Sequence, residues 1–507
     1  MFDLGTQFVA SVARDPDALA LVDGSLRLTY ADWFRRISAV VAGLDAMGLR
    51  PGDRLVSIMQ NRWEAATLHW ACQFAGVVLV PINWRATTDE IAFALTDSGA
   101  RALARDAAAA RVATDLSCLV AGTPAEPGET GFDALIAAPA PEARPRGNAD
   151  FISLMLYTSG TTARPKGVPR RHRAERAAAI AHVAQNQYAR GERTLGVMPL
   201  YHTMGVRSLL AMALVGGAFV CLRRFDPAAA LALIETERLT NLYLVPTLYH
   251  DLLHHPDFRR RDVTSVRKLG FAGASMTDAL LRALTESFRP DLFVNHYGSS
   301  EIYTFTIDPD APRKPGSAGR AGINQQIRVV RLNGAGPDDL AAPGEEGEIA
   351  ALASSDEAFE GYWNRPEATA RALRDGWYYT GDTGHFDPDG DLFVTGRVDD
   401  MIITGGENVS PVEIERCLSL HPAVSEVAVA GLPDPRWGRV VTAFIRRAAP
   451  VDAGALDAHC RASALAAFKR PRRYVFVAEI PRSPVGKLLR RKLVAGEYTE
   501  APTEDTP

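Results

Sequence analysis

The chain has 507 residues, of which 47% are hydrophobic and 23% charged, so it is long enough for two or more domains with a large core. The formal net charge of −4 argues against a dedicated nucleic-acid-binding protein, which would be strongly basic. The five cysteines are scattered and form no C-x-x-C pair, which indicates a reducing compartment. The sequence shows neither a secretion signal nor a membrane-spanning stretch, so we expect a cytoplasmic protein.

Predicted helices and strands alternate along the first part of the chain. Thr29 precedes apolar residues at helical spacing and is a suitable cap for a helix. A strand over 54–59, a helix over 61–75 and a strand over 77–82 form a β–α–β unit, which predicts a parallel sheet. The end of the Ala- and Pro-rich stretch 102–147 is typical of a solvent-exposed connector.

The pattern continues with predicted strands at 195–198, 219–222, 242–245, 268–272 and 293–296. Short strands separated by Gly and Pro then predict a small β subdomain, and a compact α+β segment follows Arg397. The predicted fold class is therefore α/β. We expect a large N-terminal domain of parallel or mixed sheets with helices over 1–396, a hinge at 397–400 and a small mobile α+β domain over 401–495. A disordered tail is expected over 496–507.

The segment from Tyr157 to Gly167 follows a predicted buried strand and contains Ser/Thr hydroxyls, a glycine and Lys166. Small residues let backbone N–H groups approach a polyanion, and the lysine adds positive charge, so the segment fits a phosphate-binding loop. It is not a Walker A loop, because Pro165 stands where that motif has its second glycine. Taken alone, the segment fits a flexible surface turn equally well.

Further motifs decide between these interpretations. They are the segments 199–205, 297–301, 379–382, 396–400, 405–408 and 484–487. In this order they resemble the signature segments of the adenylate-forming superfamily, which comprises acyl-CoA synthetases, luciferases and the adenylation domains of peptide synthetases. The resemblance covers nearly the whole chain. Segments 271–276, 396–403, 436–438 and 468–471 are most similar to aryl-CoA ligases of the halobenzoate type. One departure is Ala163, where the family's phosphate loop usually has glycine.

The resemblance implies an acid–thiol ligase that forms an acyl-adenylate from ATP, releases pyrophosphate and then makes an acyl-CoA thioester. It implies ATP, Mg²⁺ and coenzyme A as cofactors or co-substrates, and a small-molecule carboxylic acid as partner. The implied catalytic residues are Lys487, Glu301, His202 and Arg397, and Glu301 and Thr161 are the implied metal ligands. The implied ATP- and AMP-binding residues are Thr158, Ser159, Gly160, Thr161, Thr162, Lys166, Gly273, Ala274, Ser275, Asn295, His296, Tyr297, Gly298, Ser299, Ser300, Asp382 and Arg397.

Two further sets follow from the same resemblance. The acid pocket would consist of His202, Thr203, Met204, Tyr243, Ala272, His296, Gly298, Tyr303 and Thr304. The CoA site would consist of Arg85, Gly406, Glu407, Asn408, Trp437, Phe468, Arg470 and Arg472. The mixture of flat apolar and polar side chains in the pocket favours a small aromatic or heteroaromatic acid. Arg207 nearby keeps a dicarboxylate such as malonate open, and a fatty acid is a further alternative.

Simpler interpretations of single residues stand beside these. Lys487 could belong to a solvated basic face with Arg490, Arg397 could pair with Asp399 or Asp400, and Glu301 could be a helix N-terminal charge. A stand-alone enzyme that loads a carrier protein, a kinase and an inactive binding protein are the alternative functions. A homodimer is left open.

Overall fold

The computed structural model describes residues 2–112, 114–158, 165–332, 334–404, 407–463, 465–482 and 488–501, without the side chains of 407 and 408. The chain forms two compact units. Unit 1 comprises Met1–Ile327 and Ala351–Tyr378, and unit 2 comprises Arg328–Ala350 and Tyr379–Pro507. This division differs from the expected boundary after residue 396, because part of the predicted β subdomain groups with the C-terminal residues. The hinge at 397–400 stays a prediction.

The first sheet of unit 1 has the strand order β7-β6-β5-β3-β4-β8-β9. Its strands pair in parallel except β8 and β9, which form an antiparallel hairpin. The predicted β–α–β unit is confirmed as β3, α3 and β4. The strands are β3 (Arg54–Ile58), β4 (Val78–Pro81), β5 (Ala102–Asp106), β6 (Ser117–Ala121), β7 (Glu129–Gly131), β8 (Ile152–Thr158) and β9 (Lys166–Arg171).

Helices α3 (Trp63–Ala75), α4 (Thr88–Ser98) and α5 (Phe132–Ala137) contact strands of this sheet, and α1 (Leu4–Arg14) and α2 (Tyr30–Ala46) pack against α3. The predicted cap is confirmed, because the Thr29 side chain accepts from the Asp32 backbone in a capping box at the start of α2. The expected connector before β8 is exposed or partly exposed at every residue of 137–147 except one. Ala143 is buried, and its N–H donates to Ser38 Oγ over 3.0 Å, which satisfies a backbone group that the core would otherwise leave unpaired.

The second sheet of unit 1 has the order β16-β15-β14-β13-β12-β10-β11-β1-β2. Its central strands are parallel, as predicted, and small shifts of their ends are the only differences from the predicted strands among 195–296. The strands are β1 (Leu19–Asp23), β2 (Leu26–Thr29), β10 (Arg193–Gly196), β11 (Ala218–Cys221), β12 (Asn241–Leu244), β13 (Lys268–Phe271), β14 (Leu292–Tyr297), β15 (Thr306–Asp308) and β16 (Arg320–Ala321).

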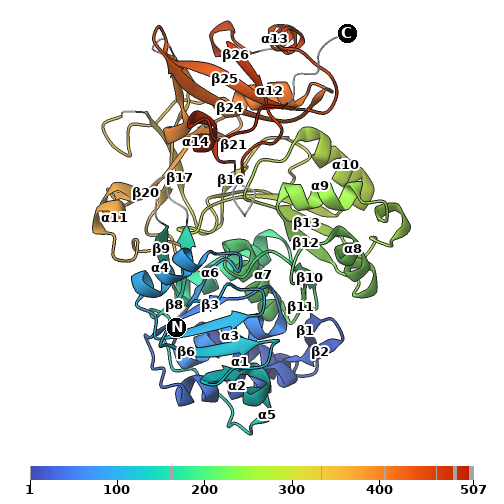
Figure 1. The fold of residues 1–507 in the computed structure, drawn as a ribbon, viewed down its shortest axis with the longest axis vertical. Coiled ribbons are helices and arrows are strands. Elements are labelled where there is room, and N and C mark those ends of the chain that lie inside the picture. Colours follow the sequence, from blue (N-terminus) through green and yellow to red (C-terminus); the bar gives the residue numbers. More distant parts are fainter. Residues whose placement is uncertain are drawn as a thin grey trace. The chain divides into compact units, whose positions relative to one another are not determined.

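Two groups of helices lie at the second sheet, and one of them also borders the first sheet (Figure 1). Helices α8 (Pro227–Thr236), α9 (Pro246–His254) and α10 (Asp278–Phe288) share one buried apolar cluster with strands β12 to β14. The 3-10 turn η1 (Phe258–Arg260) follows α9. Helices α6 (His172–Gln185) and α7 (Thr203–Val215) pack against each other, α6 beside β8 and β9 and α7 beside β10, β11 and β12. The pair therefore connects the two sheets of unit 1.

A third sheet has the order β17-β18-β20-β19, with β21 paired to β20. Its elements are β17 (Ile327–Arg331), β18 (Gly347–Leu352), α11 (Pro366–Ala372), β19 (Leu373–Arg374), β20 (Trp377–Phe386) and β21 (Leu392–Arg397). The predicted short strands at 347–352 and 391–395 are confirmed as β18 and β21. The 3-10 turn η2 (Val398–Asp400) follows β21.

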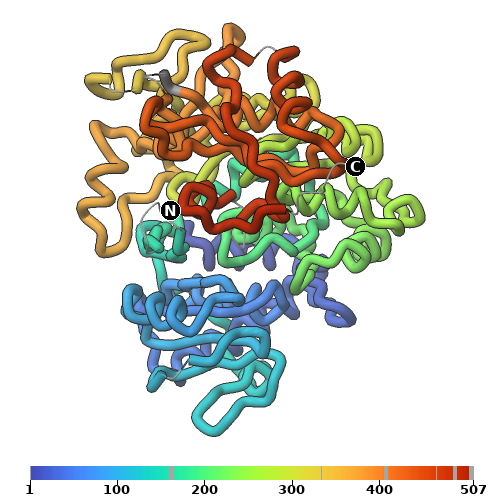
Figure 2. Tube along the Cα trace, turned by 45° about the horizontal axis from the view of Figure 1, so that its top comes forward, coloured from blue at the N-terminus to red at the C-terminus, as the bar shows by residue number. Residues whose placement is uncertain are grey.

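The last sheet, in unit 2, has the order β23-β22-β25-β24, with β26 paired to β25. Figure 2 traces this part of the chain in orange to red. Its elements are β22 (Ile402–Thr404), β23 (Glu407–Val409), α12 (Pro411–Ser419), β24 (Val424–Asp434), β25 (Gly438–Arg447), α13 (Ala453–Ala462), η3 (Ala467–Lys469), β26 (Arg473–Phe476) and α14 (Arg490–Val494).

The end of the chain differs from the sequence-based expectation in two places. The basic helix predicted from Leu488 begins at Arg490, because Leu488 instead forms a β-bridge with Arg482. The expectation of a disordered tail is wrong for 496–501, and the remaining tail residues lie outside the described residues. Tyr498 packs its ring 5.1 Å from that of Phe444, and backbone bonds join 499 and 501 to β26 and the residues after it. Among the described residues, no helix combines the length and apolar character that a membrane span requires.

Candidate functional site

The predicted phosphate loop connects the two strands of the β8–β9 hairpin. Thr158 pairs with Lys166 across the hairpin, so both predicted residues stand at its open end. Ser159, Gly160, Thr161, Thr162 and Ala163 lie outside the described residues. Lys166 Nζ lies 4.0 Å from the ring centroid of Tyr362, an aromatic residue that sequence reasoning missed.

Glu301 is held beside this hairpin by contacts on both its side chain and its backbone. Tyr362 Oη donates to Glu301 Oε1 over 2.7 Å, and the carboxylate residue is only 7% exposed. The Glu301 carbonyl accepts from Arg170 Nη1 at 2.8 Å, and its N–H donates to Ser299 Oγ at 3.2 Å. The alternative of a helix N-terminal charge is wrong, because Glu301 lies in the non-helical segment between β14 and β15.

The surroundings of Glu301 fit a hard divalent cation. Carboxylate oxygens are the ligands that Mg²⁺ prefers, and this carboxylate has a second oxygen besides the one that Tyr362 engages. The nearby lysine and phosphate hairpin are suited to the polyphosphate that such a cation would accompany. Thr161, the other predicted ligand, is outside the described residues.

The predicted adenine-binding segments lie where two neighbouring parallel strands end. Gly273 follows β13 with φ +83°, a conformation that favours glycine, and exposed Ala274 and Ser275 come next. Asn295, on β14, donates from Nδ2 to the Ser317 carbonyl at 2.7 Å. Open α/β sheets bind ligands beyond these carboxyl ends. The rest of this predicted set, placed from the end of β14 onward, comprises His296, Tyr297, Gly298, Ser299 and Ser300.

His202 stands at the N-terminus of α7, on a connection that is fixed by a buried amide. Asn61 Nδ2 donates to the carbonyls of Gly196 and Met198 at 3.0 and 2.6 Å, and its Oδ1 accepts from Leu200 N–H at 3.1 Å. His202 Nδ1 lies 3.4 Å from Thr203 Oγ1. Sequence reasoning missed Asn61, which lies in the connection between β3 and α3 and carries no local motif.

The predicted acid pocket brings together aromatic side chains from β12 and β14. The rings of Tyr243 and His296 lie 5.1 Å apart, edge to face. His182, which the sequence analysis missed, lies 4.7 Å from Tyr243 and 5.2 Å from His296. Met204 and Ala272 belong to the same buried apolar cluster as Tyr243. The rings of His182, Tyr243 and His296 therefore form one aromatic wall.

Polar and charged side chains adjoin this wall. Tyr303 Oη donates to Glu175 Oε2 at 3.1 Å, and the Arg170 guanidinium lies 4.1 Å from the Tyr303 ring centroid. Thr304 N–H donates to Glu357 Oε2 at 3.1 Å. Burial raises the pKa of the Glu357 carboxyl, whereas Arg207 acts in the opposite direction. Gly298 is needed here, because a Cβ at that position would stand 2.1 Å from the Tyr303 carbonyl oxygen.

In unit 2, Asp382 and Arg397 lie opposite each other on β20 and β21. Arg397 Nη1 donates to Asp382 Oδ1 over 2.6 Å, so two predicted nucleotide-binding residues are in contact. Asp400, one of the alternative partners considered for Arg397, accepts instead from Arg490 Nη1 at 3.1 Å. Arg490 also binds Glu415 through Nη2 at 2.7 Å and is largely buried, so it is not part of a solvated basic face.

The predicted CoA residues of unit 2 include one charged aromatic contact. The Arg472 guanidinium lies 4.1 Å from the Trp437 ring centroid, and Asp434 Oδ1 accepts from Trp437 N–H at 2.9 Å. Phe468 is 42% exposed, and Arg470 Nε donates to the Leu465 carbonyl at 3.3 Å. Arg85, in unit 1, lies over the Trp84 ring at 4.0 Å. Glu407 and Asn408 form part of β23, whereas Gly406 and Lys487 are outside the described residues.

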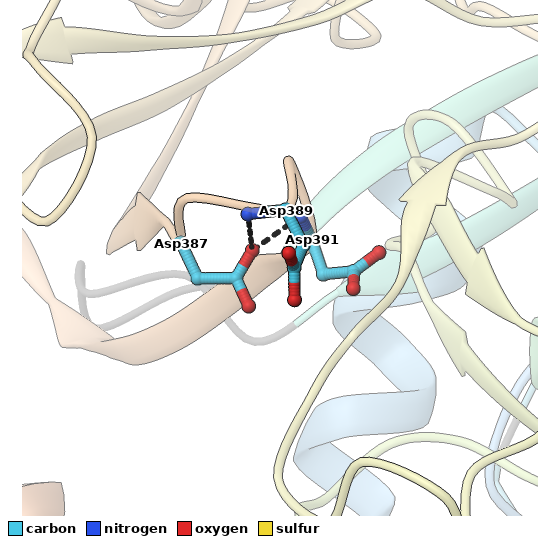
Figure 3. Close-up of side chains that lie close together, drawn as sticks. All are labelled: Asp387, Asp389 and Asp391. Atoms are coloured by element: carbon cyan, nitrogen blue, oxygen red, sulfur yellow. Dashed lines mark hydrogen bonds between the residues drawn. The ribbon is translucent and has the colours of Figure 1, made fainter.

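Three carboxylates that were not predicted as a site meet in the turn between β20 and β21 (Figure 3). Asp387 Oδ1 accepts from the N–H groups of Asp389 at 3.0 Å and Asp391 at 2.9 Å. Aspartate side chains commonly stabilise turns in this way. We therefore assign the cluster to the structure of the hairpin turn.

Comparison with known proteins matches both parts of the chain. The family model for AMP-binding enzymes matches residues 8–363, and that for the AMP-binding enzyme C-terminal domain matches residues 413–487. Feruloyl-CoA synthase from Amycolatopsis sp. is 36% identical over 491 residues, covering 96% of this chain and 97% of the relative. 4-Chlorobenzoate–CoA ligase from Arthrobacter sp. is 36% identical over 517 residues, covering 98% and 95%.

A solved structure of a CoA synthetase also matches nearly the whole chain. The o-succinylbenzoate CoA synthetase from Bacillus subtilis, in complex with its acyl-adenylate intermediate, superimposes with a TM-score of 0.84 and 28% identity. The match covers 96% of this chain and 97% of that one.

Proposed function

The chain belongs to the family of AMP-binding enzymes, and from this premise we propose an ATP-dependent ligase that joins a small aromatic or heteroaromatic acid to coenzyme A through an acyl-adenylate. The observation that carries the proposal is the group formed by Lys166, at the open end of the β8–β9 hairpin, with Tyr362 and Glu301. It combines a cation for phosphate with a buried, fixed carboxylate. The relatives that are 36% identical act, by their names, on ferulate and 4-chlorobenzoate.

The chemistry requires two steps because a carboxylate alone has no good leaving group. In the first step a carboxylate oxygen attacks the α-phosphorus of ATP, a P–O bond forms, and pyrophosphate leaves. In the second step the CoA sulfur attacks the acyl carbon, AMP leaves with the former carboxylate oxygen, and the thiol proton goes to solvent or a base. Negative charge gathers in the first transition state, so the protein must supply fixed cations and hydrogen-bond donors.

This chain's residues would divide these tasks. Lys487 would neutralise charge where the carboxylate meets the α-phosphate. The Asp382 carboxylate, oriented by Arg397, would accept from the ribose hydroxyls. Glu301 would hold Mg²⁺, which supplies charge neutralisation at the phosphates when it is bound. Trp437, with Arg472 against its ring, would contact CoA.

The acid specificity rests on the wall formed by Tyr243, His296 and His182. Flat rings from two strands and a helix suit a planar acid, and the polar groups around them disfavour an alkyl chain that leaves them unpaired. A small aliphatic or dicarboxylic acid such as malonate, or a fatty acid, is the alternative substrate. Loading of a carrier protein is the alternative second step.

The proposal is tested by incubating the purified protein with ATP, Mg²⁺, CoA and a panel of aromatic, dicarboxylic and fatty acids. We expect AMP, pyrophosphate and an aryl-CoA in equal amounts, with the highest kcat/KM for an aromatic acid. ADP as the nucleotide product would indicate a kinase. Adenylate formation without thioester would support the carrier-protein alternative, and a fatty acid as the best substrate would overturn the aromatic assignment.

A further inference from the structure

Four polar side chains from different elements of unit 1 are buried together at the acid pocket. They are His182 on α6, Arg207 on α7, Tyr243 on β12 and His296 on β14, with exposed fractions of 0, 2, 2 and 3%. Arg207 Nη1 lies 3.4 Å from Tyr243 Oη, and its guanidinium lies 5.3 Å from the Tyr303 ring centroid. The Tyr243 hydroxyl is therefore one acceptor for this guanidinium, and the Glu357 carboxyl supplies opposite charge nearby, but Arg207 Nε–H has no acceptor among the described residues. A buried donor of this kind is seldom left unpaired, so it requires an explanation.

Asn186 determines which nitrogen of each histidine carries a proton. Its Nδ2 donates to the His182 carbonyl at 2.8 Å and lies 3.0 Å from His182 Nδ1, which therefore accepts. Its Oδ1 lies 3.1 Å from His296 Nε2, which therefore donates. Burial lowers the pKa of both imidazoles well below the usual value, and the charge of Arg207 lowers it further, so both rings are neutral at pH 7. The proton of His182 is then on Nε2, and His296 Nδ1 carries a lone pair.

Four polar atoms at this place are buried and have no hydrogen-bond partner among the described residues. Arg207 Nε and His182 Nε2 are donors, His296 Nδ1 is an acceptor, and the Thr304 hydroxyl can be either. Native proteins pair nearly all such atoms. Together the set offers donors and an acceptor beside one aromatic wall. A ligand group that both accepts and donates a hydrogen bond would satisfy it.

Resting on the proposed function, we propose that the acid substrate carries a ring hydroxyl at the end away from its reacting carboxylate, and that Arg207 and His296 determine this specificity. The hydroxyl oxygen would accept from Arg207 Nε–H, and its hydrogen would be donated to His296 Nδ1. A second carboxylate has no hydrogen to donate to the His296 lone pair, so we expect a dicarboxylic acid to be the poorer substrate. A methoxy group likewise has no hydrogen to donate.

The test compares kcat/KM for benzoate, its hydroxy derivatives, the matching methoxy derivatives and the benzene dicarboxylates. We expect one hydroxybenzoate to exceed both benzoate and its methoxy counterpart by about ten- to a hundredfold, which is the usual effect of one or two buried hydrogen bonds. In Arg207→Met the ratio of hydroxybenzoate to benzoate should fall toward one. Arg207→Lys, which keeps the charge and lacks Nε–H, should give an intermediate ratio.

Arg282→Met, an exposed arginine on α10, is the matched control and should keep the wild-type ratio. If Arg207→Met fails to fold by thermal unfolding, the wild-type panel and Arg207→Lys carry the test. Equal kcat/KM for hydroxy and methoxy acids, a benzene dicarboxylate as the best substrate, or an unchanged ratio in the Arg207 variants would overturn this inference. These results would leave the ligase assignment intact, whereas absence of AMP formation with every acid would instead refute the proposed function.

Discussion

Tyr362 donates its hydroxyl hydrogen to Oε1 of Glu301 over 2.7 Å, although the two residues lie in different segments of unit 1. The face of the same tyrosine ring is 4.0 Å from Lys166 Nζ. One aromatic side chain thus contacts both the lysine of the phosphate hairpin and the carboxylate expected to hold Mg²⁺. A small displacement of Tyr362 would change both contacts.

Tyr362→Phe should weaken Mg²⁺ binding, and so raise the Mg²⁺ requirement, without preventing folding. The substitution keeps the ring that contacts Lys166 and removes the hydrogen bond that orients Glu301. A buried hydrogen bond to a charged group contributes about 1.5–3 kcal/mol, so the Mg²⁺ concentration for half-maximal AMP formation should rise by about tenfold or more. Tyr249→Phe is the control, because it also removes a buried hydroxyl, but one that binds the backbone carbonyls of Leu242 and Gly270. An unchanged Mg²⁺ requirement in Tyr362→Phe would contradict the assigned role of Glu301.

Lys487→Ala should separate the two half-reactions. We expect the rate of adenylate formation to fall by at least about a hundredfold, the usual cost of losing one preorganised electrostatic contact. Thioester formation from supplied acyl-adenylate and CoA should fall much less, because the phosphate is then only part of the leaving group. Single-turnover measurements of each step provide the comparison.

Trp437→Ala serves as the opposite control. It should slow the use of CoA and spare adenylate formation, since its ring would contact CoA. Equal losses in both half-reactions for Lys487→Ala would show that the lysine is a general structural charge.

The predicted hinge is tested by Asp399→Pro. Residues Val398–Asp400 form the short turn η2, and proline at its centre would fix one backbone dihedral. If the C-terminal domain must reorient between the two half-reactions, overall turnover should slow while ATP binding is retained. Asp399→Ala is the control for loss of the carboxylate. Full turnover in the proline variant would argue against a hinge at this position.

Two buried histidines predict a loss of stability in mild acid. Burial lowers the pKa of His69 to about 3, with a contribution from His172, and burial lowers that of His172 to about 4, opposed by Asp3. The unfolded chain binds protons at these positions below about pH 6.5, whereas the folded chain does not. The free energy of unfolding should therefore decrease as the pH falls from about 6.5 toward 4.

His69→Leu should reduce this dependence. Each histidine should lower the free energy of unfolding by about 2 kcal/mol between pH 7 and pH 5. Both ring nitrogens of His69 are without a hydrogen-bond partner among the described residues, so leucine removes no hydrogen bond there. Urea unfolding at the two pH values measures the difference. Parallel pH dependence in the variant and the wild type would show that His69 is already able to take up a proton in the folded chain.

Much of the fold could be predicted from local patterns. Apolar runs bounded by Gly and Pro located the strands of the second sheet, and Thr29 marked the start of α2. The order of strands could not be predicted, because it depends on contacts between distant segments. The burial of Ala143 and the ring contact of Tyr498 with Phe444 also depend on distant segments. Both residues lie in segments whose polar or small residues resemble those of a solvated linker.

The candidate site was predicted chiefly through its motifs. Glu301 and the Asp382–Arg397 pair lie in such motifs, and the structure shows how their contacts are made. His182 and Asn186 were missed because they lie on and directly after a helix rich in alanine and charged residues, where nothing local distinguishes them from surface positions. Their significance arises only when the fold brings them into contact with Tyr243 and His296.

The most direct test of the acyl-adenylate route uses an acid whose carboxylate oxygens are labelled with oxygen-18. The attacking carboxylate oxygen forms the bond to the α-phosphorus and remains there when the thiol displaces AMP. Mass spectrometry of the products after complete turnover should therefore find one labelled oxygen in each AMP and none in pyrophosphate. Label in inorganic phosphate, with ADP as the nucleotide product, or AMP without label would contradict this route.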